Sequence, residues 1–173
     1  MIENNNKSCA CCFVGHRKMK LTQDILSKVK KILESLISEK SVNVFYFGSK
    51  SEFDDLCYKV VTDLKEKYSH IKRVYVRAAY KDISDSYKNY LMESFEDTYY
   101  PESIENSGRA VYVERNYEMI NKSDYCVVYY DENYEPPKRC NKRNLPYSQP
   151  KSGTKLAYDY ALKRKKEILN VME

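Results

Sequence analysis

Small residues stand at two points where a helix-like segment begins, and turns of this kind commonly bind anions. Glycine permits a sharp turn or a close approach to a ligand, and the first N–H groups of a helix favour negative charge. The residues concerned are Gly48, Ser49, Ser51, Ser152, Gly153 and Thr154. We predict that both turns offer N–H and hydroxyl groups to a phosphate, although ordinary turns with serine helix caps would use the same residues.

Basic residues and a histidine follow other strand-like segments. Gly15, His16 and Arg17 come directly after the apolar run 9–14, and Arg77 comes near the end of a later run. His16 could transfer a proton or contact a ligand, and an arginine can clamp a phosphate. The alternative is a surface loop whose arginine pairs with a carboxylate. Because loops that leave parallel strands commonly carry function, we predict that these residues face a ligand.

Two carboxylates are weak candidates for catalysis. Glu52 lies beside the first small-residue turn, where it could orient a ribose hydroxyl or act as a base. A glutamate at a helix start more often only complements the helix dipole. Asp131 follows an apolar strand-like run and is the other candidate. These residues leave open whether the protein catalyses a reaction.

The cysteines do not have the pattern of a metal site. Cys11 and Cys12 are adjacent in a strand-like run, so their side chains point to opposite faces, whereas structural zinc sites need two suitably spaced ligand pairs. We predict no metal. A chain of 173 residues can bury a core without disulfides, so we expect its six cysteines to be reduced and largely buried.

Alternating strand-like and helix-like patterns place the candidate residues in an α/β fold. Short β-branched or aromatic runs predict strands over 9–14, 42–47, 73–78, 97–101, 125–130 and 168–172. Apolar residues at helical spacing predict helices over 25–37, 51–68, 82–92, 107–121 and 153–166. Short links between them favour parallel strands with right-handed crossovers. The exit loops would then meet at one edge of the sheet, where ligands bind in such folds.

Length, charge and hydropathy restrict the class of protein. We predict one domain over residues 9–173, preceded by a disordered or frayed segment 1–8. No apolar run is long enough to cross a bilayer and the N-terminus lacks a secretory signal, so we expect a cytoplasmic protein with no membrane contact. With 30 basic and 25 acidic residues, the net charge of +5 suits an anionic ligand but is small for a nucleic-acid-binding protein.

Residues 131–151 combine prolines with basic residues in what we predict to be a long loop. Such a loop could close over a polyphosphate or contact nucleic acid, although a solvated loop is commoner. The chain also has 18 tyrosines and no tryptophan. Tyr80 or Tyr130 could stack on an aromatic base.

Four segments together resemble a known group of proteins. They are Cys11–Arg17, Phe47–Asp54, Val113–Asp124 and Ser152–Thr154. In this order and spacing they resemble the SLOG (Smf/DprA–LOG) superfamily, and most nearly the YpsA-like proteins of bacteria and their phages. The resemblance implies a Rossmann-like, doubly wound, mostly parallel sheet with helices on both faces, and a nucleotide or nucleotide-derived ligand at the carboxyl ends of its strands. It also implies ligand contacts for Arg115 and Asn116, and it is compatible with a homodimer.

The last segment departs from the enzymes of this group. LOG-type phosphoribohydrolases carry Pro-Gly-Gly-x-Gly-Thr-x-x-Glu, whose glutamate serves the cleavage of a ribosyl bond. Gly153 and Thr154 match this motif, but Ala157 stands at the position of the glutamate. The resemblance therefore implies a sensor or binding module, for which we predict no cofactor. The alternatives are a hydrolase or transferase acting on the N-glycosidic bond of a nucleotide, with Glu52 or Asp131 as its carboxylate, and a DNA-binding protein similar to the DprA relatives.

Overall fold

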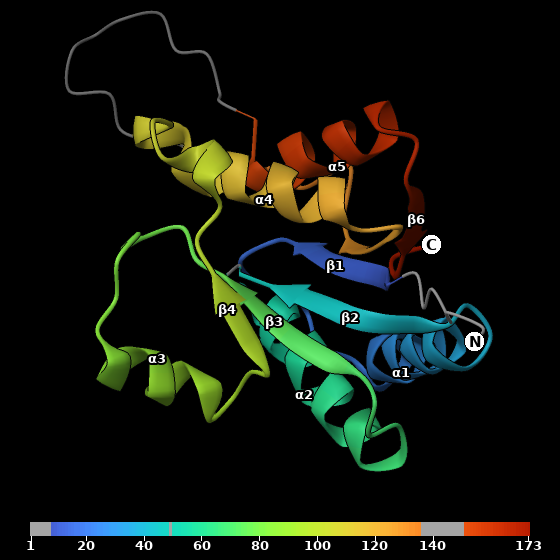
Figure 1. Ribbon diagram of the computed structural model, residues 1–173. Helices are drawn as coiled ribbons and strands as arrows, with labels where there is room; N and C mark the ends of the chain where they lie inside the picture. The colour runs from blue at the N-terminus through green and yellow to red at the C-terminus, as the bar shows by residue number, and fades with distance from the viewer. Residues whose placement is uncertain (1–7, 49, 136–150) are drawn as a thin grey trace, which may run out of the picture.

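A parallel sheet of six strands forms the centre of the protein. The computed structural model describes residues 8–48, 50–135 and 151–173, so the predicted N-terminal segment lies outside the described residues except for Ser8. The strands are β1 (Cys9–Gly15), β2 (Val42–Phe47), β3 (Lys72–Val76), β4 (Asp97–Tyr99), β5 (Tyr125–Tyr129) and β6 (Glu167–Asn170). They lie in the order β4-β3-β2-β1-β5-β6, and every neighbouring pair is parallel (Figure 1).

The order of the strands creates a switch point beside β1. From β1 the chain moves outward through β2, β3 and β4, and then returns to the other side of β1 to form β5 and β6. In open α/β sheets, the loops on either side of such a reversal leave a crevice at the carboxyl ends of the strands. The predicted Rossmann-like, doubly wound α/β fold is confirmed, and its crevice is expected beside the ends of β1 and β5.

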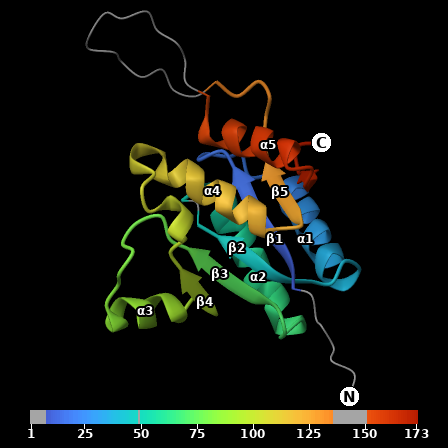
Figure 2. The same ribbon diagram turned by 45° about the horizontal axis from the view of Figure 1, so that its top comes forward.

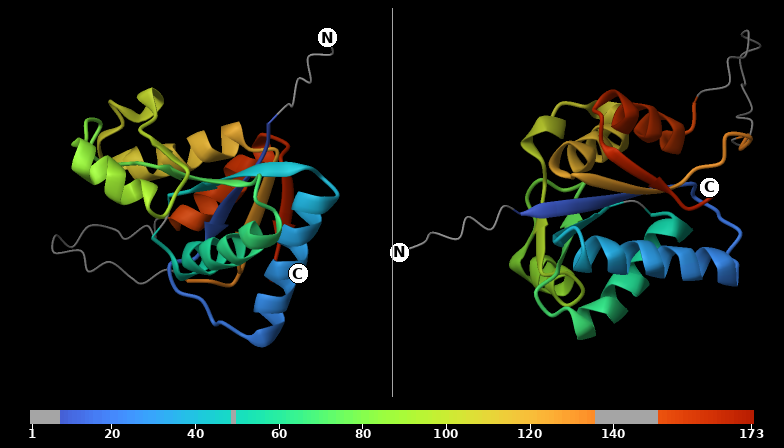
Figure 3. Two further views of the ribbon diagram at one scale, coloured as in Figure 1. Left: turned by 60° about the horizontal axis from the view of Figure 1, so that its bottom comes forward. Right: turned by 90° about the vertical axis from the view of Figure 1, so that its right-hand side faces the viewer.

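Helices cover both faces of the sheet. They are α1 (Gln23–Ser38), α2 (Glu52–Lys67), α3 (Asp85–Met92), α4 (Val111–Lys122) and α5 (Gly153–Lys163), with 3₁₀ turns at Glu102–Ile104 and Gly108–Ala110. The helices α1 and α2 lie on one face and α4 and α5 on the other, whereas α3 lies next to the edge strand β4 (Figures 1 and 3). Figure 2 shows α4 and α5 side by side on their face. Across the described ranges, no helix is both long and apolar enough to cross a membrane.

Hydroxyl side chains fix the starts of four helices. The Oγ atoms of Thr22, Ser51, Ser84 and Ser152 each accept a hydrogen bond from the backbone N–H three residues further on. A cap of this kind contributes about 1 kcal/mol to stability. The helix start predicted at Ser51 is confirmed, because a cap of this kind depends on local sequence alone.

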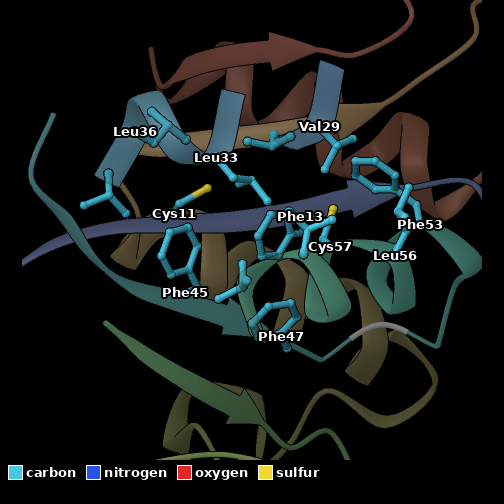
Figure 4. Close-up of a cluster of buried hydrophobic side chains, with 14 of the residues drawn as sticks. Cys11, Phe13, Val29, Leu33, Leu36, Phe45, Phe47, Phe53, Leu56 and Cys57 are labelled. Atoms are coloured by element: carbon cyan, nitrogen blue, oxygen red, sulfur yellow. The ribbon is translucent and has the colours of Figure 1, made fainter. Parts of the chain in front are cut away.

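An aromatic core fills the space between the sheet and the layer of α1 and α2 (Figure 4). The ring of Phe13 stacks on Phe47 with centroids 4.8 Å apart, and Phe45 lies 6.1 Å from it on the other side. Leu33 of α1 and Phe53 of α2 join this core and are fully buried. Burial of each such side chain contributes about 1.5–3 kcal/mol. The core therefore fixes α2, and with it the turn that precedes this helix.

A smaller core on the opposite face contains two thiols in contact. Cys12 of β1 and Cys126 of β5 are partners across the strands, and their Sγ atoms lie 3.5 Å apart. A hydrogen bond with Cys12, together with burial, raises the pKa of Cys126, so this thiol stays protonated. Cys11 and Cys57 are buried on the other face. These four cysteines are free thiols, which confirms the prediction for them.

Two of the boundaries that differ from the sequence prediction lie close to the predicted site residues. The sequence predicts one helix over 107–121, but the chain first forms the 3₁₀ turn Gly108–Ala110, and α4 begins only after it. Gly108 has a φ of 52°, which does not fit a right-handed α-helix. The strand predicted over 73–78 ends two residues earlier, which places Arg77 in the exit loop.

Candidate functional site

A cavity of about 910 Å³ opens at the carboxyl edge of the sheet. Its walls come from the ends of β1, β2 and β3, from α4, and from the starts of α2 and α5. It collects the predicted ligand residues Gly15, His16, Arg17, Gly48, Ser51, Arg77, Arg115, Asn116, Ser152, Gly153 and Thr154. Ser49 lies outside the described residues. Residues that are far apart in the sequence thus share one cavity.

The side chains around the cavity carry positive charge. The cationic residues are Arg17, Lys50, Arg77, Arg115 and Lys151. Among the residues that the structure describes, no aspartate or glutamate lines the cavity. A cleft lined by one sign of charge attracts ions of the opposite sign. The cavity therefore suits a ligand with more than one negative charge.

Arg115 reaches the cavity from α4 and is buried, with only 4 % of its surface exposed. Its Nη1 donates hydrogen bonds to the backbone oxygens of Gly48 and Val76, and its Nε donates to Asn116 Oδ1 at 3.1 Å. A mid-helix arginine is usually solvated, whereas this one ties α4 to the ends of β2 and β3. Within the described part of the chain, no carboxylate forms an ion pair with it. Because a buried charge without a counter-charge is costly, this guanidinium favours an anion in the cavity.

Gly48 leaves free the space that the Arg115 guanidinium occupies. A Cβ at this position would lie 2.8 Å from both Arg115 Nη1 and the backbone oxygen of Val76. We expect Gly48→Ala to lower the free energy of unfolding by about 1–3 kcal/mol in urea denaturation, because neither neighbour can move freely. Gly153→Ala is the matched control, since no atom lies within 4 Å of an added Cβ there. An equal loss of stability in the two variants would contradict this steric role of Gly48.

Backbone N–H groups at the start of α2 already donate hydrogen bonds within the protein. Ser51 Oγ accepts a hydrogen bond from the N–H of Asp54 at 3.1 Å, and the N–H of Glu52 donates to the backbone oxygen of Arg17 at 3.1 Å. Two of the first N–H groups of the helix are therefore occupied. Although Ser51 lines the cavity, this helix start has few donors left for an anion.

The start of α5 leaves more room for a ligand than the start of α2. Ser152 Oγ caps the helix by accepting from the N–H of Lys155 at 3.1 Å, and Thr154 Oγ1 donates to the backbone oxygen of Gly15 at 2.9 Å. Gly153 is exposed and leaves empty space where a side chain would be. The first N–H groups of a helix have no acceptor within the helix and lie at the positive end of its dipole. Of the two predicted anion turns, this one is the better placed to bind.

Gly15 and His16 have structural partners as well as a place in the cavity wall. A Cβ on Gly15 would lie 2.5 Å from Phe53 Cβ, so the absence of a side chain lets α2 pack on β1. His16 is buried, accepts a hydrogen bond from the N–H of Asp131 at Nε2, and stacks on Tyr134 with centroids 4.0 Å apart. Burial lowers the pKa of His16, so its ring is neutral at pH 7 and carries its proton on Nδ1. Among the described residues Nδ1 has no partner, and its N–H could donate to a ligand.

Arg17 and Arg77 differ in how far the protein already holds them. Arg17 is exposed, whereas Arg77 is half-buried and its Nη1 donates to the backbone oxygens of Tyr80 and Lys81. The Nε of Arg77 is buried and has no partner among the residues described. Both guanidinium groups therefore have donors left for an anion.

Neither of the two candidate catalytic carboxylates lines the cavity. Glu52 accepts hydrogen bonds from Lys18 Nζ at 2.6 Å and from the N–H of Met19 at 2.9 Å, and these bonds lower its pKa. Asp131 Oδ1 accepts from the N–H of Asn133 at 2.9 Å. Both side chains are thus engaged in local hydrogen bonds away from the cavity.

Sequence reasoning misses part of the cavity wall. The lysines and tyrosines that it missed are Lys50, Tyr75, Tyr87, Tyr112, Tyr134 and Lys151. Lys50 and Lys151 each lie next to a predicted turn in the sequence, so this proximity could have identified them as site residues. The tyrosines depend on how helices and loops pack, which local spacing does not reveal. Of the two tyrosines proposed to stack on a base, Tyr80 lines the cavity, whereas Tyr130 stacks on Tyr158 with centroids 4.4 Å apart.

The structure describes only part of the predicted basic loop over residues 131–151. Residues 136–150 of the predicted loop lie outside the described residues, and Lys151 at its end lines the cavity.

In the ranges 8–48, 50–135 and 151–173, no group of three or more histidine, cysteine, aspartate or glutamate side chains is placed to hold a metal ion.

Comparison with known proteins agrees with the resemblance carried by the four segments. No curated protein matches the chain. Residues 11–161 match the YspA SLOG family, and this range extends from β1 into α5 and so includes the walls of the cavity. The chain therefore belongs to the YspA SLOG family.

Proposed function

We propose that the protein is a binding module for a nucleotide or a nucleotide-derived ligand. The observation that carries this proposal is the composition of the cavity wall, which has five cationic side chains and five tyrosines but no carboxylate among the described residues. Membership of the SLOG family supports a nucleotide-related role. The phosphates would bind among the cations, and the base would contact the tyrosines.

The phosphate end of the ligand would lie near the start of α5. Lys151 directly precedes this helix, and Arg17 follows β1, whose end is bonded to α5 through Thr154. Hydrogen bonds from charged donors to phosphate are stronger than those from neutral donors. The N–H groups at the helix start add donors that are already oriented. Together these groups could bind a phosphate without a metal ion.

The aromatic end would lie against tyrosines from the loop after β3 and from α3 and α4. Tyr80, Tyr87 and Tyr112 line the cavity, and they are 74 %, 40 % and 61 % exposed. Stacking of a base on an aromatic side chain contributes about 1–3 kcal/mol. A cavity of this size also falls within the range of small-molecule sites. These features favour a nucleotide over an inorganic anion.

We propose that the ligand is bound without cleavage of its N-glycosidic bond. A general acid or base must lie within hydrogen-bond reach of the reacting group. Glu52 and Asp131 do not line the cavity, and Ala157, at the position of the LOG-type glutamate, is buried in the core beneath α5. Retention of the phosphate-binding turn without the carboxylate is consistent with binding alone.

A thermal-shift panel of ADP, ADP-ribose and cyclic nucleotides, with chromatography of each stabilising ligand after incubation, tests this proposal. A ligand at 100 times its Kd should add about 2.7 kcal/mol of stability, and we expect it to be recovered intact. Recovery of a free base and a sugar phosphate would instead identify an enzyme. Stabilisation by DNA alone, with strong salt dependence, would point to a nucleic-acid-binding protein and contradict the proposal.

Gly153→Glu should weaken nucleotide binding by at least tenfold in calorimetry, a loss of about 1.4 kcal/mol. The new carboxylate would extend into the empty space at the start of α5 and repel the phosphates. A glutamate in the first turn complements the helix dipole, so the variant should fold normally. Gly153→Ala should bind like the unmodified protein. Unchanged affinity in Gly153→Glu would show that the phosphates do not bind at α5.

A further inference from the structure

A buried carboxyl lies behind the proposed anion site. Asp54 is on the first turn of α2, is only 6 % exposed, and does not line the cavity. Its Oδ1 has no partner among the described residues. The guanidinium of Arg115 is the charged group that acts on it most strongly, and Arg115 itself lines the cavity. Arg115 is therefore placed to interact with both the carboxyl and a bound anion.

Several groups around Asp54 influence its ionisation. They are Arg115 from α4, Asp55 from its own helix, and the backbone N–H of Gly48 at the end of β2. Asp54 in turn contributes to the raised pKa values of Cys57 on its own helix and Tyr75 of β3. Burial outweighs the favourable effects of Arg115 and the Gly48 N–H, and it raises the pKa of Asp54 to about 8. Burial also raises the pKa values of Tyr75 and Cys57, so these two groups are neutral near pH 8. Among these groups, Asp54 is thus the one whose charge changes near pH 8, whereas Arg115 stays charged.

We infer that binding of an anion in the cavity is coupled through Arg115 to protonation of Asp54, so that anion affinity falls as the pH rises above neutral. This inference rests on the proposed function, because it needs an anion in contact with Arg115. Ionised Asp54 and the anion compete for one positive charge, since no other carboxylate in the described residues pairs with Arg115. Protonated Asp54 leaves that charge to the ligand.

The direction of the pH dependence follows from linkage. The bound anion adds negative charge near Asp54 and raises its pKa further, so the complex holds more protons than the free protein near pH 8. Affinity is therefore highest below that pH and declines to a lower plateau above it. His16 does not interfere, because burial lowers its pKa and keeps it neutral in this range. Nucleotide phosphates, with a second pKa of about 6, do not titrate there either.

Calorimetric titration with ADP at about pH 7.5 and about pH 9.5 tests the coupling. The unmodified protein should bind ADP about fivefold more weakly at the higher pH. Asp54→Asn carries a neutral side chain of nearly the same shape. Its affinity for ADP should therefore be the same at about pH 7.5 and about pH 9.5. Asp55→Asn removes a neighbouring but exposed charge, and as the matched control it should retain the pH dependence.

Two further readouts separate coupling from a merely structural role of Asp54. Titrations at about pH 8 in buffers of different ionisation enthalpy should show proton uptake on binding in the unmodified protein and none in Asp54→Asn. The stability of the unliganded protein should fall as the pH rises from 3.8, the usual pKa of this carboxyl, to about 8, and Asp54→Asn should lack this decline. Equal ADP affinity at both pH values, or a pH dependence that persists in Asp54→Asn, would overturn the coupling and leave the proposed function standing. Absence of binding by ADP and by every other nucleotide of the thermal-shift panel at both pH values would overturn both.

Discussion

Arg115→Met should weaken nucleotide binding by about 30-fold or more and destabilise the fold in the same variant. Loss of the guanidinium leaves the buried backbone oxygens of Gly48 and Val76 without their donor. An unsatisfied buried acceptor costs about 1–3 kcal/mol, so we expect a loss of about 2–4 kcal/mol in urea denaturation. Removal of a buried charge that pairs with a ligand typically costs about 2–5 kcal/mol of binding, which is a loss of about 30-fold to a few thousandfold in calorimetry.

Two other arginine variants make this result specific. Arg109→Met removes an exposed arginine from the 3₁₀ turn before α4, outside the cavity wall, and should change neither property. Arg115→Lys keeps the charge but lacks the guanidinium, whose Nη1 bonds two backbone oxygens while its Nε bonds Asn116, so its stability and affinity should be intermediate. ADP binding by Arg115→Met at the affinity of the unmodified protein would contradict the placement of the anion beside Arg115.

Phe13→Ala should cause the largest loss of stability of any substitution considered. Phe13 is 1 % exposed, lies in β1, and packs against Phe45 and Phe47. Phenylalanine-to-alanine changes in a packed core cost about 3–5 kcal/mol, a large share of the 5–15 kcal/mol that stabilises a typical domain. Chemical denaturation monitored by circular dichroism measures this loss.

Leu21→Ala is the control for Phe13→Ala, because Leu21 is 59 % exposed. Its effect should stay within about 0.5 kcal/mol. A loss of less than about 1 kcal/mol in Phe13→Ala would show that the core below the cavity is not closely packed, and that it does not hold β1 and α2 in fixed positions.

The sequence was sufficient to predict the elements and the general place of the site. Apolar runs and serine caps are local signals, and for this reason the strands and the helix start at Ser51 could be located. Parallel strands gather their exit loops at one edge, which is why Gly48 and Gly153 could be assigned to one crevice before their contacts were known.

The contacts of Arg115 and His16 could not be predicted in the same way. Arg115 bonds to Gly48, which is 67 residues away, and His16 to the backbone of Asp131, which is 115 residues away. Such pairs depend on how α4 and the loop after β5 pack on the sheet. Local periodicity gives a mid-helix arginine no reason to be buried, so only the resemblance to the SLOG superfamily indicated Arg115.

The two small-residue turns look alike in sequence but differ in the structure. At α2 the N–H of Glu52 is bonded to the backbone oxygen of Arg17, whereas at α5 the position of Gly153 is open. The difference arises because the loop after β1 lies against the start of α2. No property of either turn alone would have shown which one is free to bind.

The central claim is that the cavity binds a nucleotide-type anion at the start of α5 and leaves it intact. The most direct test is an NMR titration of the ¹⁵N-labelled protein with ADP, followed through the backbone amides. We predict saturable shifts of the Gly153 and Thr154 amides, with the ADP unchanged at the end of the titration. Saturation with no change at these amides, or the appearance of free adenine, would contradict the account.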